Sequence, residues 1–166
     1  MNDIYEEIVD RIRGQVTDLE QLVQRVLMAW SHSKRSQDDE GISLDSVALN
    51  LHGFYSGLER LFELISRHVD QSVPAGEIWH RDLLQQMCQE IPNVRPAVIS
   101  SGTISSLDEL RRFRHLVRNV YTFNLVPGKM ESLVLDLPEL WSKVKAELLA
   151  FADFLSELAG ETKTIK

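Results

Sequence analysis

Residues 4–30 read IYEEIVDRIRGQVTDLEQLVQRVLMAW, and this stretch sets the fold class of the chain. Its apolar residues recur at steps of three or four, as they do on one face of an α-helix. Gly14 lies inside the pattern and lowers the helix propensity without interrupting the spacing. We therefore predict one long amphipathic helix of about 45 Å. Its apolar face consists of Ile4, Ile8, Ile12, Val16, Leu19, Val23, Val26 and Trp30.

The same spacing predicts a second long helix after a polar connection. The connection is expected from Ser31 to Ser43, because this run is rich in polar and charged residues. Ser43 is the expected N-cap of a helix from Leu44 to about His68. The packing stripe of this helix is expected to be Val47, Leu51, Phe54, Leu58, Leu61, Phe62 and Ile65.

Three shorter patterns complete the chain. A helix is expected from about Glu77 to Glu90, between proline-containing stretches. Ser106-Leu107-Asp108-Glu109 fits a capping box and predicts the start of an arginine-rich helix that lasts to about Phe123. The last helix is expected to end near Gly160, with Pro138 either in its first turn or at a kink. Five helices without a convincing strand predict an all-α, up-and-down bundle.

Length and composition fit one such bundle. The chain has 166 residues, of which 43% are hydrophobic and 26% charged, enough for one well-packed domain. We expect a single helical domain over residues 1–160 and a frayed C-terminal tail over residues 161–166. There is no uninterrupted apolar run of 18 residues, and the first seven residues lack the pattern of a signal peptide. These features predict a cytoplasmic protein without a membrane partner.

Several kinds of chemistry find no support in the sequence. Cys88 is the single cysteine, which excludes an internal disulfide and a cysteine-rich zinc site, and its apolar context favours a core position. The five histidines are scattered, with no pair at the i, i+4 spacing of a zinc-binding helix. Neither a phosphate-binding glycine loop nor a nucleophile elbow occurs. We therefore expect neither a catalytic metal nor a cofactor.

The most informative segment for function is residues 111–121, RRFRHLVRNVY, which holds four arginines in a chain of net charge −7. A helical wheel separates an apolar side from a polar side. The apolar side is Phe113, Leu116, Val117 and Val120, and the polar side is Arg111, Arg114, His115, Arg118, Asn119 and Tyr121. Arginine offers planar donors to phosphate, histidine can exchange a proton near neutral pH, and tyrosine can stack on a base. The polar side suits an RNA backbone; the alternative is a solvated face whose arginines pair with Asp108 and Glu109.

Three segments around this helix carry a resemblance to a known family. They are WHRDLL at 79–84, VRPAVI at 94–99 and LDELRRFRH at 107–115. With them, nearly the whole chain resembles the HepT type of HEPN-domain proteins, all-helical ribonuclease toxins encoded beside a minimal nucleotidyltransferase antitoxin. The resemblance implies a homodimer in which the two motif helices face each other across a shared cleft.

The resemblance also implies a catalytic motif of arginine, histidine and tyrosine. Arg114 takes the arginine position and Tyr121 the tyrosine position, but Asn119 stands where the histidine is expected. An amide cannot transfer a proton at pH 7. Three explanations are open: a deliberate substitution that silences a toxic enzyme, a natural branch without activity, or proton transfer by His115. The third is geometrically allowed, because His115 and Asn119 are about 6 Å apart along a helix and about 40° apart around it.

The mechanism that the resemblance implies is metal-independent cleavage of RNA, with transfer RNA as the expected substrate. Arg114, helped by Arg118 or Arg111, would stabilise charge on the phosphorane, and His115 or the residue at 119 would handle protons. The partner nucleotidyltransferase would neutralise the toxin by transferring AMP to Tyr121. That modification would place bulk and negative charge beside the arginines.

Two other functions and a few further residues are alternatives to this interpretation. One alternative is a non-catalytic HEPN module that dimerises and binds RNA, a nucleotide or the nucleotidyltransferase, and another is a helical scaffold whose arginine face meets an acidic partner. His80 is interpreted as a packed or capping histidine and left out of the catalytic set. Arg95 is a weak candidate for RNA contact, and the three tryptophans are expected to pack in the core.

Overall fold

The computed structural model of the chain describes residues 2–119 and 127–164. Within these ranges the chain forms five α-helices, one short π-helix and no strand, which confirms the expected all-α bundle. The helices are α1 (Asn2–Arg35), α2 (Glu40–Ile65), α3 (Trp79–Met87), α4 (Ser101–Asn119) and α5 (Pro127–Thr164), and the π-helix η1 (Ser66–Asp70) continues α2.

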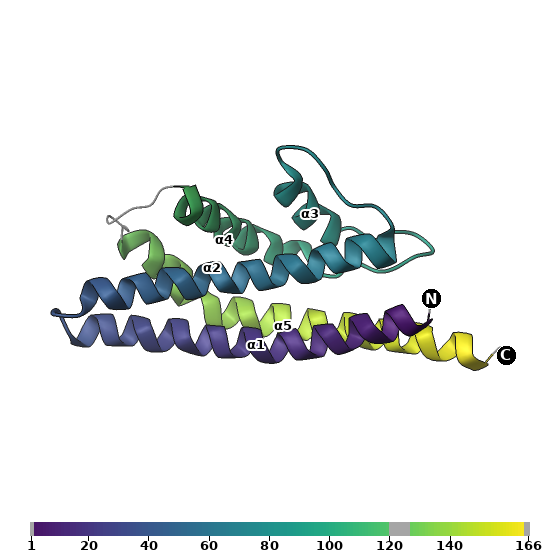
Figure 1. Cartoon of the computed structure of the whole chain (residues 1–166), viewed down its shortest axis with the longest axis horizontal. Helices are drawn as coiled ribbons and strands as arrows, with labels where there is room; N and C mark the ends of the chain where they lie inside the picture. Colours follow the sequence, from purple (N-terminus) through teal and green to yellow (C-terminus); the bar gives the residue numbers. More distant parts are fainter. Residues whose placement is uncertain (1, 120–126, 165–166) are drawn as a thin grey trace.

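The long helices α1, α2 and α5 lie lengthwise beside one another, and the shorter α3 and α4 lie on the opposite side of α2 from α1 (Figure 1). Helix α1 packs against both α2 and α5, whereas α2 also contacts α3 and α4. Helix α2 therefore joins the long-helix layer to the pair of helices that carries the candidate site.

The predicted apolar stripes form the core. All seven residues of the stripe predicted for α2 are buried, and so are the six residues of the α1 stripe between Ile8 and Val26. Trp141 of α5 meets Phe54 of α2 edge-to-face, with ring centroids 5.6 Å apart. Trp30 and Trp79 are only partly buried at the edge of the core. The sequence spacing was therefore a sufficient guide to the buried face of each long helix.

The expected connection between the first two helices was too long at both ends. Helix α1 continues to Arg35, where the Lys34 ammonium lies 4.6 Å from the centre of the Trp30 ring. Helix α2 begins at Glu40, so Ser43 is buried inside the helix and Asp39 is the N-cap residue. A run of polar residues is compatible with an exposed helix end as well as with a loop. The sequence pattern alone could not distinguish these two structures.

The bounds of the later helices also differ from the expectation. Helix α3 is shorter at both ends than predicted, and α4 begins at Ser101, so Ser106 lies inside a helix that it was expected to cap. The α4 start is instead held from α5, because the backbone N–H and hydroxyl of Ser100 donate to the Glu147 carboxylate at 3.0 and 2.6 Å. The predicted end near Phe123 lies outside the described residues.

Helix α5 extends past its expected end and decides between the two positions considered for Pro138. It begins at Pro127 and includes Pro138 in its interior, which excludes a first-turn position for Pro138. It also runs past Gly160 to Thr164, through most of the segment expected to be a frayed tail.

A buried ion pair holds the segment between α3 and α4. The Arg95 guanidinium donates to Asp70 Oδ2 at 2.7 Å and to the backbone carbonyl of Gln89 at 2.9 Å, and neither charged side chain is accessible to solvent. The expectation that Arg95 reaches RNA was therefore wrong. Its hydrogen bonds join η1 to the α3–α4 connection.

Across residues 2–119 and 127–164, we find no helix long and apolar enough to cross a membrane. The same ranges contain no group of three or more metal-ligating side chains placed to hold an ion.

Candidate active site around the arginine-rich helix

Two adjacent faces of α4 pack against neighbouring helices, and this determines which of its arginines are exposed to solvent. Leu107, Leu110 and Arg114 are buried, and so is Phe113 on the neighbouring face. Leu116, which was predicted to be on the apolar side, is 39% exposed. Arg114 was predicted to be on the polar side, yet only 7% of its surface is exposed. Contacts of α4 with both α2 and α5 account for the burial of Arg114, because a helix held between two neighbours buries a wider arc.

Arg114 pairs with a carboxylate from α2. Its Nη1 donates to Glu59 Oε1 at 2.6 Å and its Nη2 to Glu59 Oε2 at 3.3 Å. The Glu59 side chain is as deeply buried as the guanidinium, at 6% and 8% exposed. Two buried charges of opposite sign are thus paired through the fork geometry that guanidinium groups favour.

His80 of α3 completes a cluster with this pair. Its Nδ1 lies 2.8 Å from Glu59 Oε2 and 2.9 Å from Arg114 Nη2. The imidazole also stacks on the Trp79 ring, with centroids 3.6 Å apart and planes at 29°. Nδ1 therefore faces both a hydrogen-bond acceptor and a donor. Stacking on Trp79 fixes the plane of the imidazole ring.

Tyr55 lies beneath the cluster. The Arg114 guanidinium carbon is 5.2 Å from the centre of the Tyr55 ring, within the range of a cation–π contact. Burial raises the pKa of Tyr55 well above its usual range, and the negative charge of Glu59 raises it further. Tyr55 is therefore a neutral packing surface for the guanidinium at physiological pH.

A pocket of about 580 Å³ opens on the solvent side of this cluster. Residues 76–81, which include His80 and Arg81, form one wall, and Arg111 and His115 of α4 form the other. Arg111 is held by its Nε, which donates to Asp108 Oδ1 at 2.7 Å. Two histidines and two arginines thus line one pocket, whose size suits a small-molecule ligand or part of a larger one.

Comparison with known families agrees with the resemblance seen in the sequence. The family model described as HepT-like protein matches residues 46–155, which is well over half of the chain and includes the pocket. The chain belongs to the HepT-like family. No curated protein and no solved structure gave a significant match to it.

In this HepT-like protein the predicted site residues fall into three groups. Arg111 and His115 line the pocket. Arg114 lies behind the pocket wall in its ion pair with Glu59. The side chains of Arg118 and Asn119, and the whole of Tyr121, lie outside what the structure describes.

Sequence reasoning missed two residues of the HepT-like site. Glu59 was not singled out, and His80 was interpreted as a packed residue. A glutamate inside the apolar stripe of α2 was the available signal for Glu59, since a buried carboxylate needs a partner. For His80 the signal was its place in the family-like segment at 79–84. The contact between His80 and Glu59 spans 21 residues of sequence, and the contact between His80 and Arg114 spans 34. Neither could be seen in a local sequence pattern.

The lone cysteine of this HepT-like chain offers no alternative nucleophile. Burial raises the pKa of the Cys88 thiol, and the nearby Glu147 carboxylate raises it further. A raised pKa leaves little thiolate at neutral pH. The thiol packs against the core, in agreement with its expected structural role.

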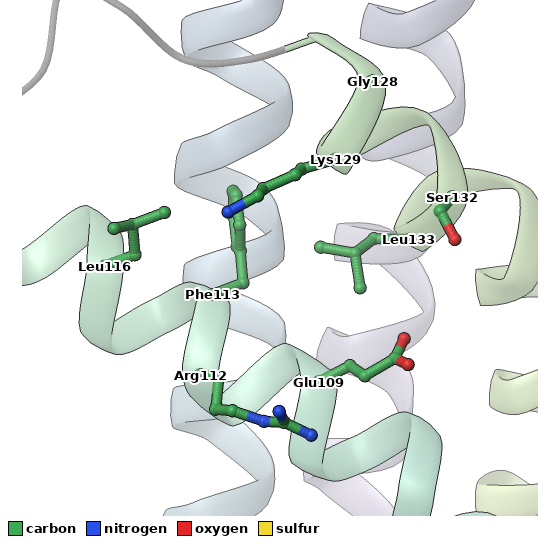
Figure 2. A pocket seen from close by; sticks show the side chains of 8 residues that line it. All are labelled: Glu109, Arg112, Phe113, Leu116, Gly128, Lys129, Ser132 and Leu133. Atoms are coloured by element: carbon green, nitrogen blue, oxygen red, sulfur yellow. The ribbon is translucent and has the colours of Figure 1, made fainter.

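A second hollow, of about 570 Å³, lies between α4 and α5. Figure 2 shows Lys129 reaching from α5 toward Phe113 and Leu116 of α4, with Arg112 and Glu109 at the other end of the hollow. A smaller hollow of about 230 Å³ also lies between α4 and α5, beside Thr103 and Ser106. Among the described residues, neither of these hollows is lined by a histidine. Of these pockets on α4, the one beside α3 therefore has the better set of groups for acid–base chemistry.

Proposed function

We propose that this HepT-like protein is the endoribonuclease toxin of a toxin–antitoxin pair and that transfer RNA is its substrate. The observation that carries the proposal is the pocket between α3 and α4, where His115 and Arg111 from the predicted motif helix meet His80 and Arg81. Arginines attract and hold phosphate, and histidines move protons near neutral pH. These are the groups that metal-independent cleavage of RNA requires.

The reaction would use the ribose 2′-hydroxyl as nucleophile against its own phosphate. Arg111 and Arg81 would compensate the charge that builds on the phosphorane, and His115 would transfer a proton. The presence of His115 at the pocket favours the relocated-histidine explanation for Asn119. Arg114 would act indirectly in this arrangement, because its guanidinium is engaged with Glu59.

Association with other copies and with a partner follows from the same proposal. A homodimer would bring two such pockets together and double the cationic density available to RNA, which explains binding by a chain of net charge −7. The partner would be a minimal nucleotidyltransferase that transfers AMP to Tyr121, with both proteins acting in the cytoplasm. The added negative charge would compete with an RNA phosphate for the arginines.

A cleavage assay on total transfer RNA, with a chelator present, tests the nuclease. We expect the unaltered chain to cleave and His115→Ala to lose most of the activity. His32→Ala is the matched control, because His32 lies on α1 and is well exposed. Cleavage that appears only after Asn119→His would mean that the present chain is a silenced enzyme.

The second candidate is a non-catalytic module that binds RNA or its partner. Asn119 favours it, and so does the occupation of Arg114 by Glu59. Absence of cleavage in the unaltered chain, in Asn119→His and in His115→Ala, with RNA binding retained, would establish this candidate instead.

The AMP transfer has its own test. The chain is incubated with the nucleotidyltransferase and ATP, and its mass is measured. We expect a gain of one or more AMP units that Tyr121→Phe abolishes. No mass gain, or a gain that survives Tyr121→Phe, would rule out Tyr121 as the control point.

A further inference from the structure

We propose that His80, oriented by Glu59, is a second catalytic residue of the pocket and transfers a proton opposite His115. This inference rests on the proposed ribonuclease function. It differs from what the family motif implies, since His80 belongs to α3 and not to the motif helix α4.

The first argument is the hydrogen bond that fixes the His80 ring. Glu59 Oε2 lies 2.8 Å from Nδ1, so the tautomer with hydrogen on Nδ1 donates to a buried carboxylate. The Nε2 lone pair is then available to accept a proton. The carboxylate also stabilises the imidazolium that forms, as in other carboxylate–histidine pairs. Trp79 holds the plane of the ring, because the two rings stack.

The second argument concerns which tautomer the two contacts at Nδ1 favour. Arg114 Nη2, 2.9 Å away, could pair with Nδ1 only in the tautomer that has its hydrogen on Nε2, which cannot accept a proton there. Glu59 Oε2 is closer, at 2.8 Å, and pairs with the tautomer that has its hydrogen on Nδ1. With that hydrogen kept in place, Nε2 can take up a proton and release it again.

Arg114 gains a role in this arrangement. The guanidinium contacts both oxygens of Glu59, at 2.6 and 3.3 Å, and so fixes the orientation in which Oε2 meets His80 Nδ1. Arg114 and Glu59 are positioning residues, and His80 is the group that would meet the substrate.

The third argument is the pocket itself. His80 and His115 come from different helices and line the same space, together with Arg81 and Arg111. One histidine would take the proton of the 2′-hydroxyl while O2′ forms its bond to phosphorus. The P–O5′ bond then breaks, and the other, protonated histidine gives its proton to O5′. The products are a 2′,3′-cyclic phosphate and a 5′-hydroxyl, and the arginines compensate the charge between the two steps.

The decisive variant is His80→Gln, which keeps a hydrogen-bonding amide but cannot transfer a proton. Its cleavage rate, RNA affinity and unfolding midpoint are compared with those of the unaltered chain. We expect cleavage to fall roughly 10²–10⁴-fold, with RNA affinity and midpoint nearly unchanged. In His80→Ala, added imidazole should restore part of the cleavage, which it should not do in His32→Ala, whose activity should be normal.

The possible failures are distinguishable. Cleavage by His80→Gln within threefold of the unaltered chain, while His115→Ala is inactive, would overturn the role of His80 and leave the ribonuclease function standing. No cleavage by the unaltered chain, although it binds RNA, would overturn the function and the role of His80 together. Products without a 2′,3′-cyclic phosphate end would overturn the reaction as written.

Discussion

The Glu59 carboxylate and the Arg114 guanidinium, 55 residues apart in the sequence, meet in a buried ion pair with a 2.6 Å contact. The pair joins α2 to α4 behind the pocket wall. Within residues 2–119 and 127–164, the buried Arg114 Nε has no hydrogen-bond partner. Such a pair specifies a geometry more than it adds stability, because desolvation of both charges offsets their attraction.

The first prediction concerns the stability that depends on this pair. Glu59→Leu and Arg114→Met, made singly, should each lower the free energy of unfolding by about 3–5 kcal/mol, because each leaves one uncompensated buried charge. The double variant should lie close to the unaltered chain. Urea unfolding of all four proteins gives the comparison. Single variants within about 1 kcal/mol of the unaltered chain would mean that water reaches the remaining charge.

The second prediction separates the two adjacent arginines of α4. Arg111 lines the pocket beside α3 and Arg112 lines the hollow beside α5, although both pair with Asp108. Arg111→Ala should weaken RNA binding and lower the salt dependence, the slope of log Kd against log salt, by about one. Arg112→Ala is the matched control and should change both much less. Equal losses would indicate that RNA lies across α4 and not in the proposed pocket.

The third prediction is a pH dependence that Tyr55 should cause. Its pKa is raised in the folded chain, so the unfolded chain releases this proton first, near the ordinary value of 10.0. Stability from this group is therefore present below pH 10 and is lost as the pH rises above it. The difference in unfolding free energy between the unaltered chain and Tyr55→Phe should shrink by about 1 kcal/mol from pH 10 to pH 11. A constant difference over that range would show that Tyr55 ionises as easily folded as unfolded.

The sequence predicted the buried face of each long helix because that face is a periodic, local property. Helix ends were predicted less well: Ser106 looked like a cap, but Ser100 provides the start of α4 through Glu147 of α5. Arg114 shows the same limit at the site. The helical wheel places it on the polar side of α4, yet its side chain is buried because it pairs with Glu59 of α2. Contacts between segments far apart in the sequence determine both the start of α4 and the burial of Arg114. A single sequence does not show which distant residues are in contact.

His80 shows how a correct structural interpretation can leave out a residue that lines the candidate site. It packs on Trp79, as expected of a histidine beside a tryptophan. It also touches Glu59 and Arg114 and lines the pocket, which only the three-dimensional arrangement reveals. Arg111 and His115, which also line the pocket, could be predicted from the sequence because the motif helix itself carries them.

The last prediction concerns Gly57, which faces α1 two residues before Glu59. A Cβ atom at Gly57 would lie 2.7 Å from Gln15 Nε2 and 2.9 Å from Leu19 Cδ2, whereas one at Gly53 would meet nothing closer than 3.7 Å. Leu19 is fully buried, so it cannot move aside without disturbing the core. Alanine in a helix interior is favoured over glycine by about 1 kcal/mol, but overpacking costs about 1–3 kcal/mol.

Gly53→Ala should therefore raise the free energy of unfolding by about 1 kcal/mol, and Gly57→Ala should lower it by up to about 2 kcal/mol. Urea unfolding with an unchanged m-value measures both. Because Gly57 precedes Glu59 by two residues, a shift of α2 away from α1 would also move the carboxylate toward α3 and α4. We thus expect Gly57→Ala, but not Gly53→Ala, to slow RNA cleavage. Equal stability and equal activity of the two variants would mean that α1 yields at this contact and that the position of Glu59 does not depend on it.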